Sequence, residues 1–307
     1  MKTAILCSGQ GSQYVGMLKD ISEHFPTTLG KISLADELIG YKLSEICFDG
    51  PPDLLKETRN TQPALFLHSA VVYDLIKELL EVNAAAGHSV GEYAALYAAG
   101  VLSFVDAFKL VALRGKLMFE AGEKLPGTMF AVIGLEDEKV EAVCRELTES
   151  GNGNVVVAAN FNCPSQVVVS GSAEYLRNNT AAFKQAGAKI VKELVVSGAF
   201  HSPLMKPAKE ELEKAILATN FNTARIPVYS NVYAKPLTDS DELKNALIMQ
   251  LESPVLWTQS IKKIYEDGIN NFIEVGAGNV LQGLVKRIVS DSQISGFDKV
   301  SDITEKL

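Results

Sequence analysis

Two hydrophobic periods alternate along the first part of this chain and predict strands followed by helices. Residues 3–6 and 83–86 are short, continuous apolar runs of the kind that forms buried strands. Residues 103–121 place apolar side chains at helical spacing, which predicts an amphipathic helix. Another helix is expected to begin at residues 61–63, because proline fits the first helical turn. This alternation of strand and helix is typical of an α/β fold.

Residues 127–197 follow a different pattern, with more strands than helices. Apolar and β-branched runs bounded by turn residues predict four strands, at residues 128–134, 154–161, 166–170 and 189–196. Amphipathic stretches predict two helices, at residues 136–150 and 173–187. The resulting order, β-α-β-β-α-β, is that of a ferredoxin-like unit.

The pattern returns to α/β character after residue 197. It predicts strands and helices at residues 226–230, 241–252, 258–266, 271–275 and 280–289. No low-complexity linker separates the three blocks. We therefore predict a larger α/β domain of residues 1–126 and 198–307, with a ferredoxin-like small domain of residues 127–197 inserted in it. The cleft between two such domains is a common place for a ligand site.

Composition and charge narrow the class of protein. The net charge of −8 argues against a broad nucleic-acid-binding surface. No apolar run approaches the length of a membrane span, and residues 4–7 are too short an apolar stretch for a signal peptide, so a cytoplasmic location is expected. No metal site is expected either, since the cysteines are far apart and lack metal-ligand spacing. They are Cys7, Cys47, Cys144 and Cys163.

Candidate chemistry centres on residues 87–91, which read Gly-His-Ser-Val-Gly between the apolar run and an alanine-rich run. A strand, a tight turn and a helix would place Ser89 at a sharp elbow, where glycines remove Cβ atoms that would clash. Its hydroxyl would project at a helix N-terminus, where free N–H groups can receive an oxyanion. This pattern is the nucleophile elbow found in many serine hydrolases.

A serine hydroxyl needs a base, and the chain has four histidines. His24 is expected on the surface, and His68 is expected to be packed within an apolar helix. His88 adjoins Ser89 but points away from it in an extended segment, so it is expected to support the turn. His201 lies in a loop after the inserted unit, and the order serine then histidine matches elbow hydrolases. We therefore favour His201 as the base.

No acidic residue stands out as the third group that would orient the imidazole. Glu193 falls within a strand pattern and is expected at the surface. A backbone carbonyl could orient the imidazole instead. The missing carboxylate argues against an ordinary lipase or esterase.

Several separate motifs occur in order over nearly the whole chain. They are residues 9–13, 61–64, 87–93, 113–118, 160–162, 199–202 and 250–257. In this combination the chain closely resembles the malonyl-CoA:acyl carrier protein transacylases of fatty-acid synthesis, and also the acyltransferase domains of polyketide synthases. The resemblance implies a hydrolase-like α/β core with a parallel sheet and an inserted ferredoxin-like domain, in agreement with the elements predicted above.

The resemblance also implies catalytic roles. Ser89 would be acylated by malonyl-CoA, and His201 would take its proton and later activate the incoming thiol. The backbone N–H groups of Val90 and Gln10 would form the oxyanion hole. A main-chain carbonyl at Gln250 would orient the histidine, which would explain the missing carboxylate.

Arg114 carries the prediction of the substrate. From its apolar helix alone, a position at the surface is favoured over a second role, that of a partly buried residue that needs an anion. The resemblance favours the second role, because a guanidinium can bind the free carboxylate of malonyl through two parallel hydrogen bonds. Met118 would lie on the same helix face, in the acyl pocket or in the core. Phe200 resembles the bulky residue of malonyl-selective relatives.

Three further polar residues lie in family-like segments. Gln62 and Asn160 are predicted near the substrate, and Asn231 near the site, and structural hydrogen bonding is the favoured role for Gln62 and Asn231. Ser8 stands where the family usually has proline, which frees the backbone before Gly9.

The resemblance implies a ping-pong reaction without a metal or organic cofactor. Malonyl-CoA would load Ser89, and the phosphopantetheine thiol of acyl carrier protein would take the malonyl group. Lys286 and Arg287 lie on the last clear helix and could meet the CoA phosphates or the acidic carrier protein. A monomer is expected. The alternatives are a free-standing polyketide synthase acyltransferase, an acyl hydrolase of the same fold, a serine esterase, and a non-catalytic docking module.

Overall fold

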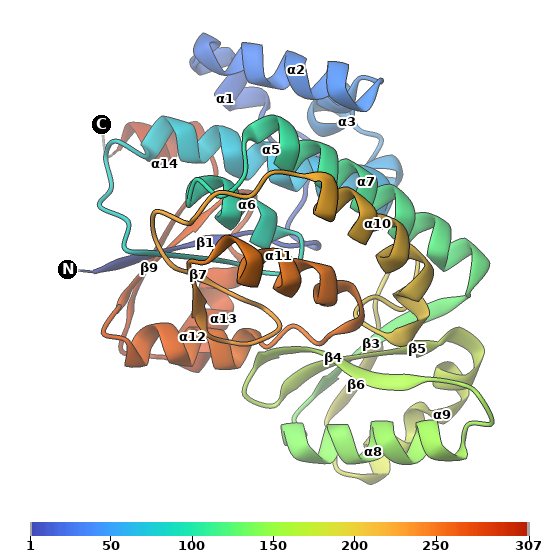
Figure 1. Cartoon of the computed structure of the whole chain (residues 1–307). Helices are drawn as coiled ribbons and strands as arrows, with labels where there is room; N and C mark the ends of the chain where they lie inside the picture. Colours follow the sequence, from blue (N-terminus) through green and yellow to red (C-terminus); the bar gives the residue numbers. More distant parts are fainter. Residues whose placement is uncertain (1, 306–307) are drawn as a thin grey trace.

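The computed structural model describes residues 2–305 and has two β-sheets within them (Figure 1). The larger sheet has the strand order β10-β9-β1-β2-β7-β8. The first five of these strands are parallel to one another, and β8 runs antiparallel to β7. The strands are β1 (Thr3–Cys7), β2 (Ala84–Gly87), β7 (Val228–Tyr229), β8 (Pro236–Leu237), β9 (Asn271–Val275) and β10 (Gln293–Phe297).

The central strands are buried on both faces, as their continuous apolar runs predict. Ile5 of β1 belongs to the hydrophobic core on one side of the sheet, and Leu6 belongs to the core on the other side. The register pairs Cys7 with Gly87, so β1 and β2 end next to each other. Loops that follow these two strands therefore meet at the carboxyl edge of the sheet, where ligands bind in many α/β folds.

Helices cover both faces of the larger sheet (Figure 1). One layer contains α5, α6, α7 and α10, and the opposite layer contains α12 and α13. No helix within residues 2–305 is long and apolar enough to cross a membrane. The helices are α1 (Lys19–His24), α2 (Leu29–Ile39), α3 (Leu43–Asp49), α4 (Pro52–Lys56), α5 (Thr58–Ile76), α6 (Gly91–Ala98), α7 (Phe104–Lys124), α10 (Lys206–Ala218), α11 (Ser240–Met249), α12 (Trp257–Glu266), α13 (Val280–Ile288) and α14 (Val300–Thr304).

The smaller sheet has the strand order β4-β5-β3-β6, and its neighbours are antiparallel. Two helices pack on its far face, away from the larger sheet (Figure 1). Along the chain, the four strands of this sheet and the two helices follow the order β-α-β-β-α-β, which confirms the predicted fold class. The division into domains at residues 127 and 197 stays a prediction. The elements are β3 (Gly127–Ile133), α8 (Asp137–Ser150), β4 (Val156–Cys163), β5 (Gln166–Ser172), α9 (Ala173–Gln185) and β6 (Ile190–Glu193).

The prediction that a helix begins at residues 61–63 is wrong. Helix α5 begins at Thr58, so Pro63 lies inside it rather than in its first turn. Thr58, Asn60 and Thr61 are polar yet buried, and therefore they show no hydrophobic period. Their side chains instead form hydrogen bonds, such as that from Thr61 Oγ1 to the carbonyl of Leu55 at 2.5 Å.

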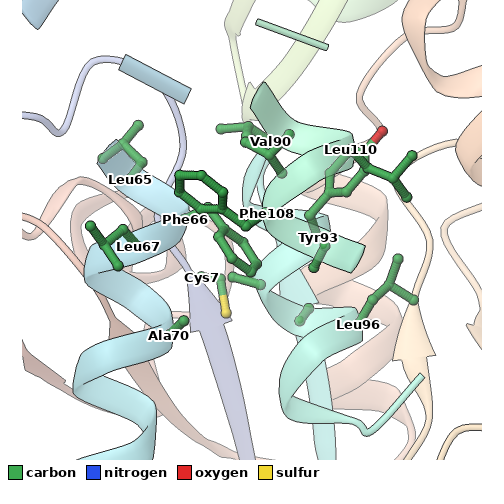
Figure 2. Close-up of a cluster of buried hydrophobic side chains, with 14 of the residues drawn as sticks. Cys7, Leu65, Phe66, Leu67, Ala70, Val90, Tyr93, Leu96, Phe108 and Leu110 are labelled. Carbon is green, nitrogen blue, oxygen red and sulfur yellow. The ribbon is translucent and has the colours of Figure 1, made fainter. Parts of the chain in front are cut away.

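A cluster of apolar side chains fixes α6 between α5 and α7 (Figure 2). Phe66 of α5 and Phe108 of α7 lie with ring centroids 6.2 Å apart. Val90 lies at the start of α6 in the same cluster, and Cys7 lies at the end of β1. This packing holds the N-terminus of α6 against the carboxyl edge of the sheet.

Candidate active site

Ser89 lies in a tight turn between β2 and α6. Its φ is 53°, an unfavourable conformation for a non-glycine residue that costs roughly 1–3 kcal/mol. A Cβ on Gly87 would lie 2.0 Å from the carbonyl carbon of Gly91, and a Cβ on Gly91 would lie 2.2 Å from the carbonyl oxygen of Cys7. Both glycines are therefore required for the turn, as the motif predicts.

Asn231, which follows β7, holds this turn from the neighbouring strand. Its Oδ1 accepts a hydrogen bond from the N–H of Ser89 at 2.7 Å, and its Nδ2 donates to the carbonyl of Gly87 at 2.7 Å. The N–H of Asn231 donates to Oε2 of Glu92 at 3.2 Å. These contacts match the structural role considered for Asn231, and they stabilise the strained backbone of Ser89.

His201 lies beside the serine, although the two residues are far apart in sequence. Its Nε2 lies 2.7 Å from Ser89 Oγ. Its Nδ1 lies 3.0 Å from the carbonyl oxygen of Gln250 and 3.2 Å from that of Ser253. A carbonyl oxygen can only accept, so Nδ1 carries the hydrogen and Nε2 is free to accept the serine proton.

The environment of His201 keeps the imidazole neutral. The side chain is buried, and burial together with the nearby Arg114 cation lowers its pKa to about 3. The two carbonyl contacts oppose this shift, because they stabilise the charged form. The imidazole is therefore in the form that can take a proton.

Arg114 is buried in α7 with only 1% of its surface exposed. Its Nη1 donates to Gln62 Oε1 at 2.6 Å, and its Nη2 donates to Gln250 Oε1 and to Ser89 Oγ, each at 3.0 Å. No Asp or Glu oxygen among residues 2–305 lies within 4.0 Å of its nitrogens. The carboxyl of Glu92 acts on the guanidinium electrostatically but forms no direct ion pair with it. A buried cation without a direct ion-pair partner is costly, so the arrangement suits an anionic ligand.

The side chain of Gln250 joins several parts of the site. Besides accepting from Arg114, it donates through Nε2 to Glu92 Oε2 at 2.7 Å and to the carbonyl of Ser89 at 3.2 Å. Burial raises the pKa of Glu92 to about 7, although the bonds from Gln250 and Asn231 oppose this shift. Gln250 therefore places its backbone carbonyl against the imidazole of His201 and its side-chain amide oxygen against the guanidinium of Arg114.

A pocket of about 150 Å³ opens in front of Ser89, between the larger sheet and the smaller one. Met118 and Phe200 line it, and Met129, Val168 and Leu194 add an apolar wall from the smaller sheet or its edge. The structure thus brings most of the predicted site residues to one pocket, while Gln62 and Gln250 stand behind it and bind Arg114. The predicted residues that line it are Gln10, Ser89, Val90, Arg114, Met118, Asn160, Phe200 and His201.

Gln10 and Val90 approach the pocket from two different loops. Within the described part of the chain, neither backbone N–H donates to a protein acceptor. Gln10 lies between Gly9, where a Cβ would lie 2.6 Å from the carbonyl oxygen of His88, and Gly11, whose φ is +104°. The loop therefore comes close to the elbow, and Gln10 and Val90 both line the pocket in front of the serine.

Two polar contacts support these loops from outside the pocket. His88 Nε2 lies 2.8 Å from Asn162 Oδ1, which fits the supporting role predicted for this histidine. Ser8 Oγ donates to Glu274 Oε1 at 3.2 Å, and the same carboxylate accepts from backbone N–H groups at the start of α13. Ser8 thus anchors its loop by a side-chain contact, where proline would restrict the backbone.

Fold, site and comparison together define the class of this protein, an acyltransferase. The chain belongs to the family described as acyl transferase domain, whose model matches residues 5–303. The curated malonyl CoA-acyl carrier protein transacylase of Haemophilus influenzae is 43% identical over 303 residues, which cover 98% of this chain and 96% of the relative. That of Bacillus subtilis is 44% identical over 94% of this chain and 90% of the relative.

Solved structures of this family have the same fold. An acyl carrier protein S-malonyltransferase of Vibrio cholerae superposes with a TM-score of 0.93 at 41% identity, covering 99% of both chains. A malonyl-transacylase in complex with its type II PKS acyl-carrier protein superposes with a TM-score of 0.94 at 37% identity, covering 100% of this chain and 99% of that chain.

Proposed function

We propose that this acyltransferase moves a malonyl group from malonyl-CoA to the phosphopantetheine thiol of acyl carrier protein, through an ester on Ser89, in fatty-acid synthesis. The observation that carries the proposal is the buried guanidinium of Arg114, which lies 3.0 Å from the serine hydroxyl and forms no direct ion pair with a carboxylate in residues 2–305. An acyl group on Ser89 would lie beside a cation, and an acyl group that ends in a carboxylate would neutralise that cation.

The first half-reaction loads the serine. His201 Nε2 takes the Ser89 proton as Oγ attacks the thioester carbon, and the N–H groups of Val90 and Gln10 donate to the carbonyl oxygen as it becomes negative. The imidazolium is stabilised by the carbonyl oxygens of Gln250 and Ser253 at 3.0 and 3.2 Å. The C–S bond then breaks, and the leaving CoA sulfur takes the proton from His201.

The second half-reaction uses the same groups in reverse. The carrier thiol gives its proton to His201 and attacks the ester carbon, and the oxyanion is again held by Val90 and Gln10. The C–O bond breaks, Ser89 regains its proton, and malonyl leaves as a thioester. We propose that no metal or organic cofactor takes part, because the nucleophile, base and oxyanion donors are all groups of this chain.

The acyl carboxylate would bind Arg114 at the end of the pocket. The bonds from Arg114 to Gln62 and Gln250 hold the plane of the guanidinium, while its bond to Ser89 is replaced when the serine is acylated. Phe200 and Met118 line the pocket, and we expect their bulk to disfavour a branched acyl chain. An acyl hydrolase with the same serine and histidine would have little need for this arginine.

The pantetheine arm would approach over the loop that contains Gln10. A second cavity of about 100 Å³ shares Gln10, His88 and Asn162 with the acyl pocket and extends to α13. Arg287 on this helix contacts the side chain of Gln166 at the rim, and Lys286 precedes it. These two cations are our candidates for contacting the CoA phosphates or the acidic carrier protein. The monomeric state and the cytoplasmic location stay predictions.

A transfer assay tests this function. Malonyl-CoA is mixed with enzyme and with holo or apo acyl carrier protein, and malonyl-carrier and free malonate are measured. We expect malonyl-carrier only with the holo form, and transfer faster than hydrolysis. Release of malonate at the same rate with and without holo carrier would identify a hydrolase instead.

A further inference from the structure

A line of hydrogen bonds connects the guanidinium of Arg114 with the loop that contains Gln10. Arg114 Nη1 donates to Gln62 Oε1 at 2.6 Å, and Gln62 Nε2 donates to Thr58 Oγ1 at 2.9 Å. Thr58 Oγ1 in turn donates to Gln10 Oε1 at 2.9 Å. Thr58 is the first residue of α5 and is fully buried. No motif considered in the sequence points to it.

The chemistry of arginine fixes the direction of the first two bonds. Arginine can only donate, so the atom of Gln62 that faces Arg114 is its oxygen, and its amide nitrogen faces Thr58. The Thr58 oxygen accepts that bond, which leaves its single hydrogen for Gln10 Oε1. Both ends of the Gln62 amide and both functions of the Thr58 hydroxyl are therefore used in the structure.

Gln10 needs such an anchor because its own backbone is weakly constrained. Gly9 and Gly11 flank it, and Gly11 has a φ of +104° that only glycine adopts readily. The backbone N–H of Gln10 has no protein acceptor among the described residues. Its side-chain bond to Thr58 is therefore the polar contact that holds this residue to the rigid helix layer.

We infer that Thr58 is a positioning residue for acyl transfer: it ties Gln10, an oxyanion donor, through Gln62 to the arginine that reads the acyl group. This inference rests on the proposed roles of Gln10 and Arg114. Without the Thr58 hydroxyl, the Gln10 N–H loses its fixed direction, and stabilisation of the oxyanion falls while substrate binding is retained.

The test compares T58V with T61V. Thr61 lies in the same helix and is equally buried, but its hydroxyl bonds to the carbonyl of Leu55 and lies outside the line. We expect T58V to slow acylation of the serine by roughly 10- to 100-fold with little change in KM, because small misplacements of catalytic groups cost rates of this size. T58S should restore the rate, and T61V should retain it.

A second variant tests the same bond if T58V folds poorly. Q10A removes the other end of the bond at a half-exposed position, and it should give the same loss of rate with an unchanged melting temperature. Combining Q10A with T58V should add no loss beyond that of T58V alone, because both variants remove the bond between Thr58 and Gln10. Rates of T58V and Q10A equal to those of the wild type, or T61V as slow as T58V, would overturn the inference.

The choice of acyl donor separates this inference from the proposed function. Each variant is assayed with malonyl-CoA and with p-nitrophenyl acetate, which reports attack by the serine whatever the acyl specificity. Loss of rate in T58V with both donors supports positioning of Gln10. A wild-type enzyme that reacts with the ester but not with malonyl-CoA would overturn the proposed substrate, and the effect of T58V on the ester would still decide the role of Thr58.

Discussion

Replacing Arg114 with alanine should abolish the preference for malonyl and leave the serine and histidine in place. The guanidinium is already buried, so binding malonyl pays little further desolvation on the protein side. Hydrogen bonds to charged groups contribute about 1.5–3 kcal/mol each, and two parallel bonds therefore contribute about 3–6 kcal/mol. Since each ~1.4 kcal/mol is tenfold, kcat/KM for malonyl-CoA should fall by roughly 10²- to 10⁴-fold.

The kcat/KM of R114A for acetyl-CoA should instead rise above that of the wild type. An acetyl group on Ser89 brings only a methyl group toward the buried cation, and removing the cation relieves that mismatch. R114K is the matched control, because lysine keeps the charge but cannot form the two parallel bonds. We expect R114K to lie between the wild type and R114A in its ratio of malonyl to acetyl transfer.

The assay measures initial rates with both donors, with holo acyl carrier protein as acceptor. The informative quantity is the ratio of kcat/KM for malonyl-CoA to that for acetyl-CoA, because a general loss of folding lowers both values equally. If R114A keeps this ratio within about threefold of the wild type, Arg114 does not read the carboxylate, and the reasoning is refuted.

Two further predictions concern the base and the elbow. Because the pKa of His201 is lowered from 6.5 to about 3, the imidazole stays neutral on mild acidification. The pKa of the neighbouring Glu92 is raised to about 7, so the test uses Glu92→Gln, in which kcat/KM should fall less than about twofold between pH 7 and pH 5; an acid limb centred near pH 6.5 in this variant would contradict the low pKa of His201. Gly91→Ala should destabilise the fold by more than about 3 kcal/mol in urea unfolding, since its Cβ would lie 2.2 Å from a backbone oxygen. Gly283→Ala, in open space on α13, should be neutral or stabilising, and equal effects would contradict the close approach.

The parts of the fold that the sequence predicts best are those with an unbroken period. The buried strands β1 and β2 and the amphipathic helix α7 lie within a few residues of their predicted bounds. The six elements of the smaller sheet agree in type and order. Each has a clear apolar pattern and ends at a turn signal, so local conformational preference and burial favour the same helix or strand.

Other elements were missed because tertiary contacts determine them. The helices between Lys19 and Lys56 are short, and several depend on packing against α5 and α7 rather than on a strong period of their own. The start of α5 at Thr58 is hidden because its first turns bury polar side chains. Strand β10 at the sheet edge shows a weak pattern, with partly buried residues.

The candidate site likewise has residues that the sequence predicts and contacts that it does not. Motifs predict Ser89, His201 and Arg114, and the structure places both His201 and Arg114 within hydrogen-bonding distance of the Ser89 hydroxyl. The side-chain contacts of Gln250 and the bond of Thr58 to the Gln10 loop depend on residues far apart in sequence, and neither follows a spacing rule. Helical pattern alone favours a surface position for Arg114, which is buried, because a guanidinium buried by its partners looks the same in sequence as one on the surface.

The central claim is that Ser89 becomes a malonyl ester that the carrier thiol then removes. Intact-mass measurement of the enzyme after brief mixing with malonyl-CoA should show one malonyl adduct, peptide mapping should place it on Ser89, and holo acyl carrier protein should discharge it. Ser89→Ala should form no adduct. An adduct that persists in Ser89→Ala, or transfer to the carrier that proceeds without any acyl-enzyme, would contradict the account.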